Sequence, residues 1–495
     1  MNLPYFIIIP LLSAFIITLI GGKKDYWAIL LSMIASFSLL ILSLYSFIAM
    51  HSETISYTVG GWKIPYGIVL VQDALSLFML VLVSLISFLS LVYSAEYIKY
   101  QSSNSHYYAL FMLLITGMNG VIITGDLFNL FVFMEIALFS AFALVAYGGQ
   151  EEELEASFKY AIIGTISSAF ILIGIAVTYS ATSTLTIAKI AEKIADVNPQ
   201  VILWTGGFFM AGLGLKAAAI PFHTWLPDAH SSAPAPVSAI LSGVFIKTLG
   251  IYVLFRVFFN VFGAPQIFLS AFRILGMLSI LIGVFLAIGQ WDMKRLLAYH
   301  SISQIGYILI GMGMATPLGI LGAVFHLMNH AIFKSLLFYN AGAVEMALGT
   351  RDLRKMGNLT RILPVTSSTS MVASLSISGI PPFNGFFSKL IIIIAAVQGG
   401  FYWMAGAAVA GSILTLASFL KVQRYGFRGE TEAARPKDPV GIRMKLVMIT
   451  LAVLCLLTSL MLIPGVRQIT LDPVVAVLTH PHQYMQLVLG RSYAD

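Results

Sequence analysis

Charge and cysteine are both scarce in this chain of 495 residues, and each scarcity excludes a class of protein. Only 10% of the residues are charged, against about 25% in a typical soluble domain. Hydrophobic residues make up 59% of the chain, and the mean hydropathy is +0.91. The single cysteine, Cys455, excludes an internal disulfide framework and a thiolate metal site. The composition therefore predicts a polytopic membrane protein.

Nucleotide and cluster motifs are missing as well. The sequence contains no Walker A loop, no cysteine-rich cluster and no Gly-x-Gly-x-x-Gly fingerprint, which argues against ATP hydrolysis, iron–sulfur clusters and a dinucleotide site. We therefore expect no cofactor, no resident metal and no redox chemistry within this chain, and we leave open whether it belongs to an enzyme. The net charge of +7 does not require nucleic acid, because surplus Lys and Arg mark the cytoplasmic loops of membrane proteins.

Long apolar runs occupy most of the chain. A membrane-spanning helix needs about 20 apolar residues, and the first run is read as a retained helix rather than a signal peptide. Loops and span ends predicted to lie inside hold seventeen Lys and Arg, and those outside hold seven, which favours both termini outside. Fourteen spans are predicted, at 3–20, 26–50, 69–93, 107–124, 127–147, 158–180, 201–220, 236–259, 268–289, 295–314, 317–347, 364–398, 401–421 and 443–463.

Beside the charged residues counted at span ends, the candidate intramembrane charges in these runs are Glu135, Lys216, Lys247, Lys334 and Lys389. A charge at the bilayer centre costs roughly 2.5–3.5 kcal/mol on insertion scales, so intramembrane charges are functional by default. Their titratable groups predict movement of protons or cations. A static buried ion pair that fixes helix packing is the alternative.

Two segments look alike: each places Ile-Pro within or at the end of a long apolar run, at Pro221 and at Pro381, with a lysine nearby. Proline removes a backbone donor and breaks a helix, and paired broken helices indicate the ion site of a transporter. We therefore predict two broken helices, with Lys216 before the first break and Lys389 after the second.

Histidines supply further candidates. His326, His330 and Lys334 follow an i, i+4, i+8 pattern and form one stripe on a helix, which could pass protons through water or be purely structural. Zinc binding is disfavoured because Leu327 stands where a His-Glu-x-x-His motif has glutamate.

The proline-rich segment 221–236 also contains His223, Asp228 and His230. It is either a broken-helix connection near a proton entrance or a rigid interfacial turn anchored by Trp225. The acidic residues at 151–155 are predicted to form a solvated inside loop, with a cation-attracting funnel as the alternative.

Several of these segments resemble one family. They are 125–135 (Gly-Asp-Leu-Phe-Asn-Leu-Phe-Val-Phe-Met-Glu), 216–247 with Pro-Phe-His-Thr-Trp-Leu-Pro-Asp-Ala-His, 326–334 and 379–389. They are similar to the antiporter-like, proton-translocating subunits of respiratory complex I, of Mrp-type cation/proton antiporters and of membrane-bound hydrogenases. The histidine-rich form looks closer to complex I and hydrogenase members, whereas a lysine at 389 resembles the Mrp D type.

The resemblance implies an all-α polytopic membrane protein of about fourteen helices with two inverted five-helix repeats. The implied divisions are 1–106 (three helices), 107–260 and 261–425 (the repeats), and 426–495 (loop, last helix and tail). Glu135 and Lys216 would form a pair, Lys247 the connection, His326, His330 and Lys334 the central axis, and Lys389 the exit.

The function implied is translocation of H⁺, alone or in exchange for Na⁺, by a subunit of a multi-subunit complex in the inner or plasma membrane. Its partners would be other membrane subunits and the lipid bilayer, with no nucleic acid. A scaffold subunit that conducts nothing and a stand-alone solute carrier are the alternatives.

Overall fold

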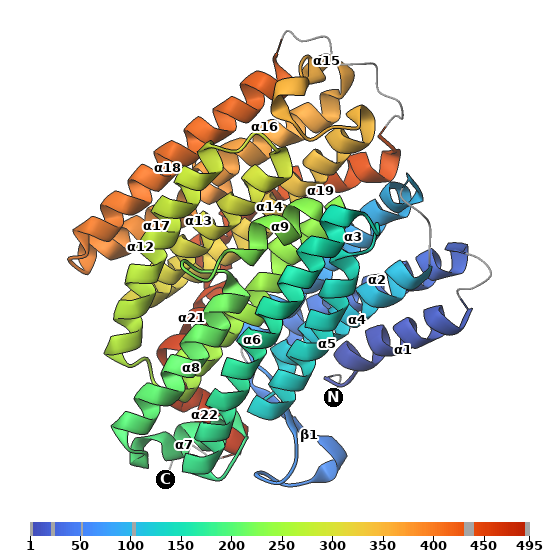
Figure 1. Cartoon of the computed structure of the whole chain (residues 1–495). Coiled ribbons are helices and arrows are strands. Elements are labelled where there is room, and N and C mark those ends of the chain that lie inside the picture. Colours follow the sequence, from blue (N-terminus) through green and yellow to red (C-terminus); the bar gives the residue numbers. More distant parts are fainter. Residues whose placement is uncertain (1–2, 21–24, 51–52, 101–104, 430–439, 491–495) are drawn as a thin grey trace.

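The computed structural model describes residues 3–20, 25–50, 53–100, 105–429 and 440–490. Some of the Lys and Arg residues counted to predict the orientation lie outside the described residues: Lys23, Lys24, Arg435, Lys437 and Arg491. Helices dominate the chain and pack into one bundle (Figure 1). Ten helical runs of the described chain are long and apolar enough to cross a membrane, and α1 and α17 are shorter apolar helices. This confirms the predicted polytopic, helical fold.

The first half of the bundle begins with helices that match predicted spans. A short helix, α7, connects α6 to α8, and the first broken helix is formed by α8 and α9. The elements are α1 (Tyr5–Ile20), α2 (Asp25–Met50), α3 (Ala74–Tyr97), α4 (Ser105–Ile123), α5 (Leu127–Val145), α6 (Glu151–Thr182), α7 (Ile187–Lys193), α8 (Pro199–Ala217) and α9 (Trp225–Ser232).

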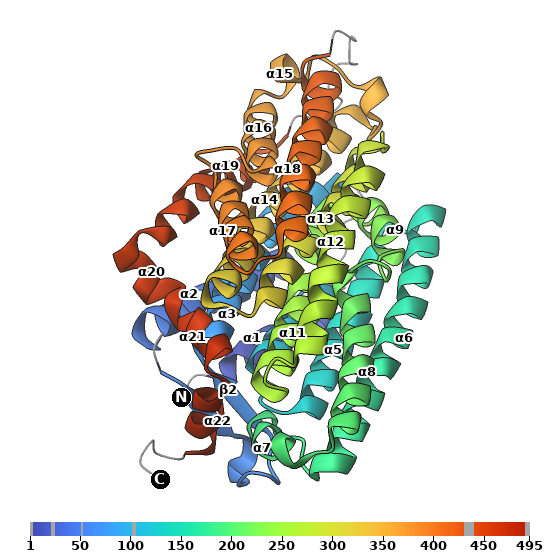
Figure 2. The same cartoon turned by 90° about the vertical axis from the view of Figure 1, so that its left-hand side faces the viewer.

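One continuous helical run at 235–261 mixes α-helical and π-helical turns. It comprises α10 (Ala235–Ile240), η4 (Leu241–Phe245), η5 (Lys247–Tyr252), α11 (Val253–Phe255) and η6 (Arg256–Val261). All of its residues and residues 319–344 of α14 are buried, so these two segments form the centre of the molecule (Figure 2).

The second half contains the other broken helix, formed by α16 and α17. The elements are α12 (Gln266–Ile288), α13 (Met293–Met314), α14 (Pro317–Leu348), α15 (Leu359–Ile362), α16 (Pro364–Ser378), α17 (Asn384–Gln398), α18 (Tyr402–Val422) with η8 (Gln423–Phe427), and α19 (Ile442–Leu457) with η9 (Thr458–Leu462). Short 3-10 turns are η1 (Val59–Gly61), η2 (Ile98–Tyr100), η3 (Ile194–Asp196) and η7 (Leu353–Lys355).

A small antiparallel sheet closes one end of the bundle, which we call the sheet end. Strands β1 (Ile55–Thr58) and β2 (Val69–Gln72) pair from Ile55↔Gln72 to Thr58↔Val69. The predicted span at 69–93 is therefore wrong at its start, because residues 69–72 form a strand and the helix begins at Ala74. Hydropathy alone does not separate a short buried strand from the first turn of a helix.

Two helix pairs close in the same way at opposite ends of the bundle. At the sheet end, backbone hydrogen bonds join the start of α5 to the segment after α6, and at the opposite end they join the start of α13 to the segment after α14. The bonds are Leu127 N to Leu185 O (2.9 Å), Ile187 N to Gly125 O (2.8 Å), Met293 N to Arg351 O (3.0 Å) and Leu353 N to Trp291 O (2.9 Å). Helices α6 and α14 are both 32 residues long. The two pairs thus correspond in layout, with inverted direction.

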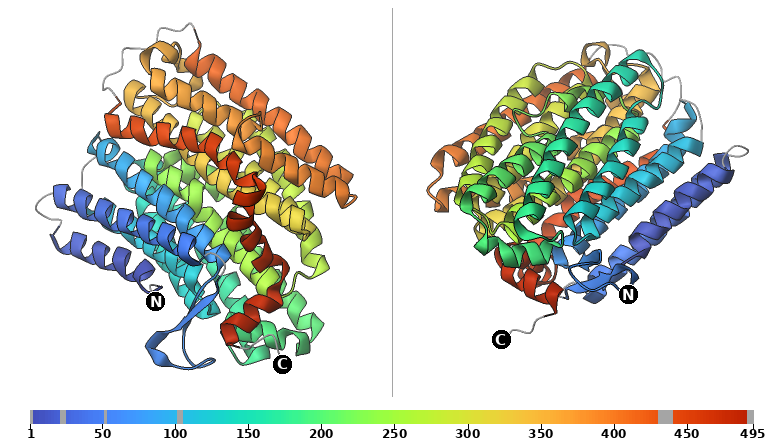
Figure 3. Two further views of the ribbon diagram at one scale, coloured as in Figure 1. Left: turned by 180° about the vertical axis from the view of Figure 1, so that it is seen from behind. Right: turned by 60° about the horizontal axis from the view of Figure 1, so that its bottom comes forward.

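The C-terminal segment runs back along the bundle toward the sheet end (Figure 3). It comprises α20 (Pro464–Thr470), α21 (Asp472–Thr479) and α22 (Pro481–Leu489); α21 packs on α14 and α3, and α22 packs on α7. A buried ion pair lies beneath it: the Arg256 guanidinium donates to both carboxylate oxygens of Asp73, at 2.6 and 2.7 Å. Asn260, which also accepts from Arg256, donates to the Val477 carbonyl at 2.9 Å.

Replacing Asp73 with asparagine is expected to lower the free energy of unfolding by about 3–5 kcal/mol, because Arg256 stays buried without its counter-charge. Thermal unfolding of the purified protein measures this. The matched control is Asp472→Asn, which removes an exposed pair with Arg467 worth about 0–1 kcal/mol. Equal effects of both changes would refute the structural role assigned to the buried pair.

Candidate functional site

The first group of charged residues joins α5, α6 and α8. The Lys216 Nζ lies 4.0 Å from Glu135 Oε1, so the predicted pair is brought together. Ser168 on α6 lies between them: its hydroxyl donates to Glu135 Oε1 and accepts from Lys216 Nζ at 2.9 Å. The same amine donates to the Gly164 carbonyl at 3.3 Å. The Lys216 side chain is buried, whereas that of Glu135 is 24% exposed.

Both predicted helix breaks are confirmed, and a lysine lies at each. Helix α8 ends at Ala217, one residue after Lys216, and the chain turns through a left-handed Ala218 (φ 53°). Helix α16 ends at Ser378 before a left-handed Gly379 (φ 80°). Lys389 lies on α17 and reaches back, donating to the Ile377 carbonyl at 2.7 Å. Carbonyls in a last helical turn lack helical partners and carry the negative end of the dipole, so both breaks favour a cation.

The central group lies between the buried run at 235–261, α13 and α14. Lys247 Nζ donates to the Ser242 carbonyl, and Lys334 Nζ donates to the Leu297 carbonyl. Ser301 connects the two sites. Its hydroxyl is 2.8 Å from the Ser242 hydroxyl and 3.3 Å from the Leu297 carbonyl. The two lysines are thereby linked through neighbouring groups without touching.

The π-helical turns surround Lys247, which begins η5. Single π turns occur often at functional sites, because they change which way a side chain points. Gly250, in the same turn, lies against α8: a Cβ atom there would come within 2.7 Å of Ala217. This close approach brings the backbone that bears Lys247 next to the end of the helix that bears Lys216, although no direct bond joins the two amines.

The third group contains the predicted histidine stripe and Lys389. His326 Nδ1 lies 2.9 Å from the hydroxyl of Ser388, the residue before Lys389. Lys389 Nζ lies 4.6 Å from the ring centre of Tyr307, which is 5.4 Å from the His326 ring. His330 follows at 6.2 Å between ring centres. The stripe therefore connects the central group to the second helix break.

The three candidate residues in segment 221–236, which are His223, Asp228 and His230, lie in different parts of the structure. His230 is buried beside the ring of Phe338, the same ring over which Lys334 lies, so it belongs to the central group. His223 lies in the break between α8 and α9, with Nδ1 at 3.3 Å from the Pro221 carbonyl. The reading of this segment as a turn anchored at the interface by Trp225 is wrong: residues 225–232 are helical, and Trp225 is buried against Tyr160.

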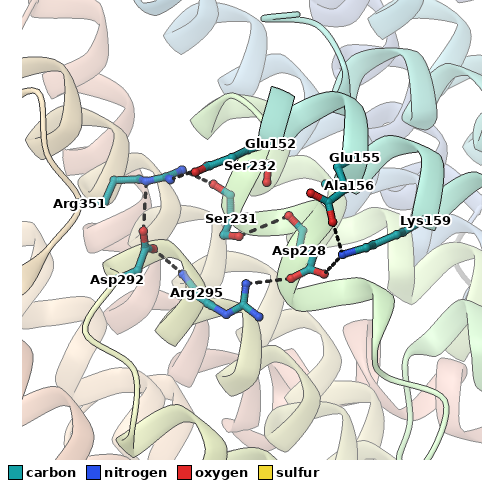
Figure 4. Close-up of a pocket in the computed structure, with 10 residues that line it drawn as sticks. All are labelled: Glu152, Glu155, Ala156, Lys159, Asp228, Ser231, Ser232, Asp292, Arg295 and Arg351. Atoms are coloured by element: carbon teal, nitrogen blue, oxygen red, sulfur yellow. Dashed lines mark hydrogen bonds and ion pairs between the residues drawn. The ribbon is translucent and has the colours of Figure 1, made fainter. Parts of the chain in front are cut away.

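Asp228 lies instead in a hollow at the end opposite the sheet (Figure 4). It pairs with Arg295 at 2.8 Å and with Lys159 at 3.3 Å. Arg351 closes the other side by pairing with Asp292 at 3.1 Å. Burial lowers the pKa of the Arg351 guanidinium, but the Asp292 and Glu345 carboxylates outweigh burial, so its pKa is raised above its ordinary value.

The prediction of a loop at 151–155 is wrong, because these residues form the first turns of α6, although Glu151, Glu152 and Glu155 are exposed as predicted. Negative side chains at a helix N-terminus are stabilised by its dipole. Glu152 faces the hollow and lies 3.5 Å from Arg351. Acidic residues next to a span are typical of both loops and helix starts, so composition does not distinguish these.

Several polar residues of the site were not predicted. The serines Ser168, Ser242, Ser301 and Ser388 join the charged groups, and Lys294, counted as a loop residue, is buried and pairs with Glu345 at 2.7 Å. Serine is common in membrane helices, where its hydroxyl often bonds to a carbonyl of its own helix. The presence of a serine in the sequence therefore does not predict a functional site. In the structure Ser168 holds the place in α6 that Lys334 holds in α14, but this match depends on the observed start of α6 at Glu151, which hydropathy had placed at 158.

Comparison with known proteins identifies the family of this chain. Residues 124–415 match the family described as NADH:quinone oxidoreductase/Mrp antiporter, TM, and residues 57–108 match the N-terminus of complex I chain 5. The D-type subunit of the Na(+)/H(+) antiporter of Alkalihalophilus pseudofirmus is 33% identical over 86% of this chain and 87% of its own.

Two solved structures share the fold along nearly the whole chain. A chain of the Mrp complex from Dietzia sp. DQ12-45-1b superposes with a TM-score of 0.91 at 27% identity, over 99% of both chains. A chain of the archaeal membrane-bound sulfane sulfur reductase superposes with a TM-score of 0.89 at 30% identity, over 98% of this chain and 99% of that one. The chain belongs to the NADH:quinone oxidoreductase/Mrp antiporter family of antiporter-like membrane subunits.

Proposed function

We propose that this chain is the ion-translocating subunit of a multi-subunit membrane complex, and that it moves H⁺, either alone or in exchange for Na⁺. One observation carries the proposal: four buried lysines and the partly exposed Glu135 belong to polar clusters that follow one another from α5 to α17. A membrane protein that serves only as scaffold has no need of four buried amines, each of which costs several kcal/mol in the bilayer core.

Protons would move along Glu135, Lys216, Lys247, Lys334, His330, His326 and Lys389. Buried polar atoms without a protein partner support a hydrated path between these groups, since such atoms in proteins usually bond to water. Both ring nitrogens of His230 and His330, Nε2 of His326 and both amide atoms of Gln304 are of this kind in the described chain. His223 and Asp228 would lie at the entrance from the hollow.

The related proteins support two kinds of complex. One relative is named as part of a Na(+)/H(+) antiporter, and one similar structure is an archaeal respiratory membrane complex. We propose other membrane subunits as partners, the plasma membrane as location, and both termini outside. The inverted halves would be 107–260 and 261–425, in keeping with the matched helix closures at opposite ends.

Glu135→Gln in the assembled complex tests the proposal. We expect ion transport into sealed vesicles to fall by about 100-fold, because the neutral amide no longer stabilises the Lys216 ammonium. The matched control is Glu192→Gln, which removes a carboxylate of similar exposure (22%) that pairs with Lys189 on α7, away from the hollow. Wild-type transport in Glu135→Gln would contradict the proposed function.

A further inference from the structure

We propose that Ser168 is a relay residue that carries a proton between Lys216 and Glu135, an inference that rests on the proposed function. The amine and the carboxylate are 4.0 Å apart, which is too long for a hydrogen bond and hence for direct proton transfer. The Ser168 hydroxyl bridges this gap with two hydrogen bonds.

The direction of both hydrogen bonds fits a relay. Lys216 Nζ donates to Ser168 Oγ, and Ser168 Oγ donates onward to Glu135 Oε1, so the three groups form one donor chain. A hydroxyl can donate and accept at once, which a carbonyl cannot do. The other acceptor of the Lys216 amine is the Gly164 carbonyl, which holds the amine in place but passes no proton on.

The proposed step balances within these three residues. An N–H bond of the Lys216 ammonium breaks and a new O–H bond forms on Ser168, while the original Ser168 O–H bond breaks and its proton bonds to Glu135 Oε1. Lysine and glutamate both become neutral, and serine regains a hydroxyl. The reverse step restores the charged pair, and no oxidant, reductant or further reactant takes part.

The second half of the chain supplies an independent observation. Ser168 lies seventeen residues after the first residue of α6, and Lys334 lies seventeen after the first residue of α14. Glu135 and Ser301 likewise both lie eight residues after the start of α5 and α13. Ser168 on α6 therefore corresponds to the titratable amine of Lys334 on α14, and Glu135 on α5 corresponds to the hydroxyl of Ser301 on α13.

Ser168→Ala in the assembled complex is the test, with ion transport into sealed vesicles as the measurement. We expect transport to fall by about 100-fold, whereas Ser168→Thr, which keeps the hydroxyl, stays within a few-fold of wild type. The control is Ser167→Ala: this adjacent serine is also buried but donates to the Gly212 carbonyl and not to either member of the charged pair.

Two results overturn the relay. One is wild-type transport in Ser168→Ala while Glu135→Gln is inactive, and the other is loss of transport in Ser167→Ala equal to that in Ser168→Ala, which would indicate a packing role. Wild-type transport in Glu135→Gln would instead contradict the proposed function itself. If Ser168→Ala lowers the yield of assembled complex, transport rates per assembled complex are compared for Ser168→Thr and Ser168→Cys. The first keeps the hydroxyl and the second replaces it with a thiol, which donates and accepts only weakly. Equal rates in the two variants overturn the relay.

Discussion

Replacing Lys216 with alanine is expected to reduce ion transport by the assembled complex by at least about 100-fold. The amine is held at the end of a broken helix by Gly164 and Ser168, and it is the only cation within ion-pair distance of Glu135 among the described residues. Removing it leaves the carboxylate without its counter-charge and interrupts the sequence of titratable groups after its first member. Transport into sealed vesicles, normalised to assembled complex, is the measurement.

Lys216→Arg separates titration from packing. Arginine keeps the positive charge next to Glu135 but does not release its proton in the physiological range. We therefore expect assembly at the wild-type level with transport as low as in Lys216→Ala. Wild-type transport in Lys216→Arg would mean that the charge alone suffices, and it would contradict a mechanism that depends on deprotonation of residue 216.

Replacing Lys334 with methionine is expected to abolish transport without lowering stability. The side chain is fully buried, its amine donates to the Leu297 carbonyl, and no carboxylate pairs with it in the described part of the chain. Methionine retains most of the apolar stem and removes a group that costs about 2.5–3.5 kcal/mol when charged in the bilayer core. The thermal midpoint of the variant should equal or exceed that of wild type.

Lys421→Met is the matched comparison for stability. The Lys421 amine, near the end of α18, donates to the carbonyls of Ile288 and Gln290 at 2.6 Å and lies over Trp291. Its loss is expected to lower the thermal midpoint and to leave transport unchanged. If Lys334→Met were the destabilised variant and still transported ions, Lys334 would be a structural residue.

The charges and prolines of the sequence predicted the main features of the site because each is costly in an apolar run. Lys216 and Lys389 with Pro221 and Pro381 indicated both helix breaks, and the i, i+4 spacing of His326 and His330 indicated one stripe. These signals come from local physical chemistry, which holds whatever the tertiary arrangement.

Features that depend on tertiary contacts were not predictable. The π turns at Lys247 and the serine between Lys216 and Glu135 follow from packing of helices distant in sequence. The burial of Trp225 follows from stacking on Tyr160 of α6, and the path of the C-terminal segment follows from its contacts with α3, α7 and α14. None of these leaves a pattern in hydropathy or spacing.

The central claim is that this chain itself conducts the ions. The most direct measurement compares the intact complex with a variant in which Lys216, Lys247, Lys334 and Lys389 are all methionine, using a pH-sensitive dye and a sodium indicator inside sealed vesicles. Our account predicts an assembled complex that retains its partner subunits and moves neither H⁺ nor Na⁺. Ion movement at the wild-type rate in that variant would contradict it and would indicate a scaffold that conducts nothing.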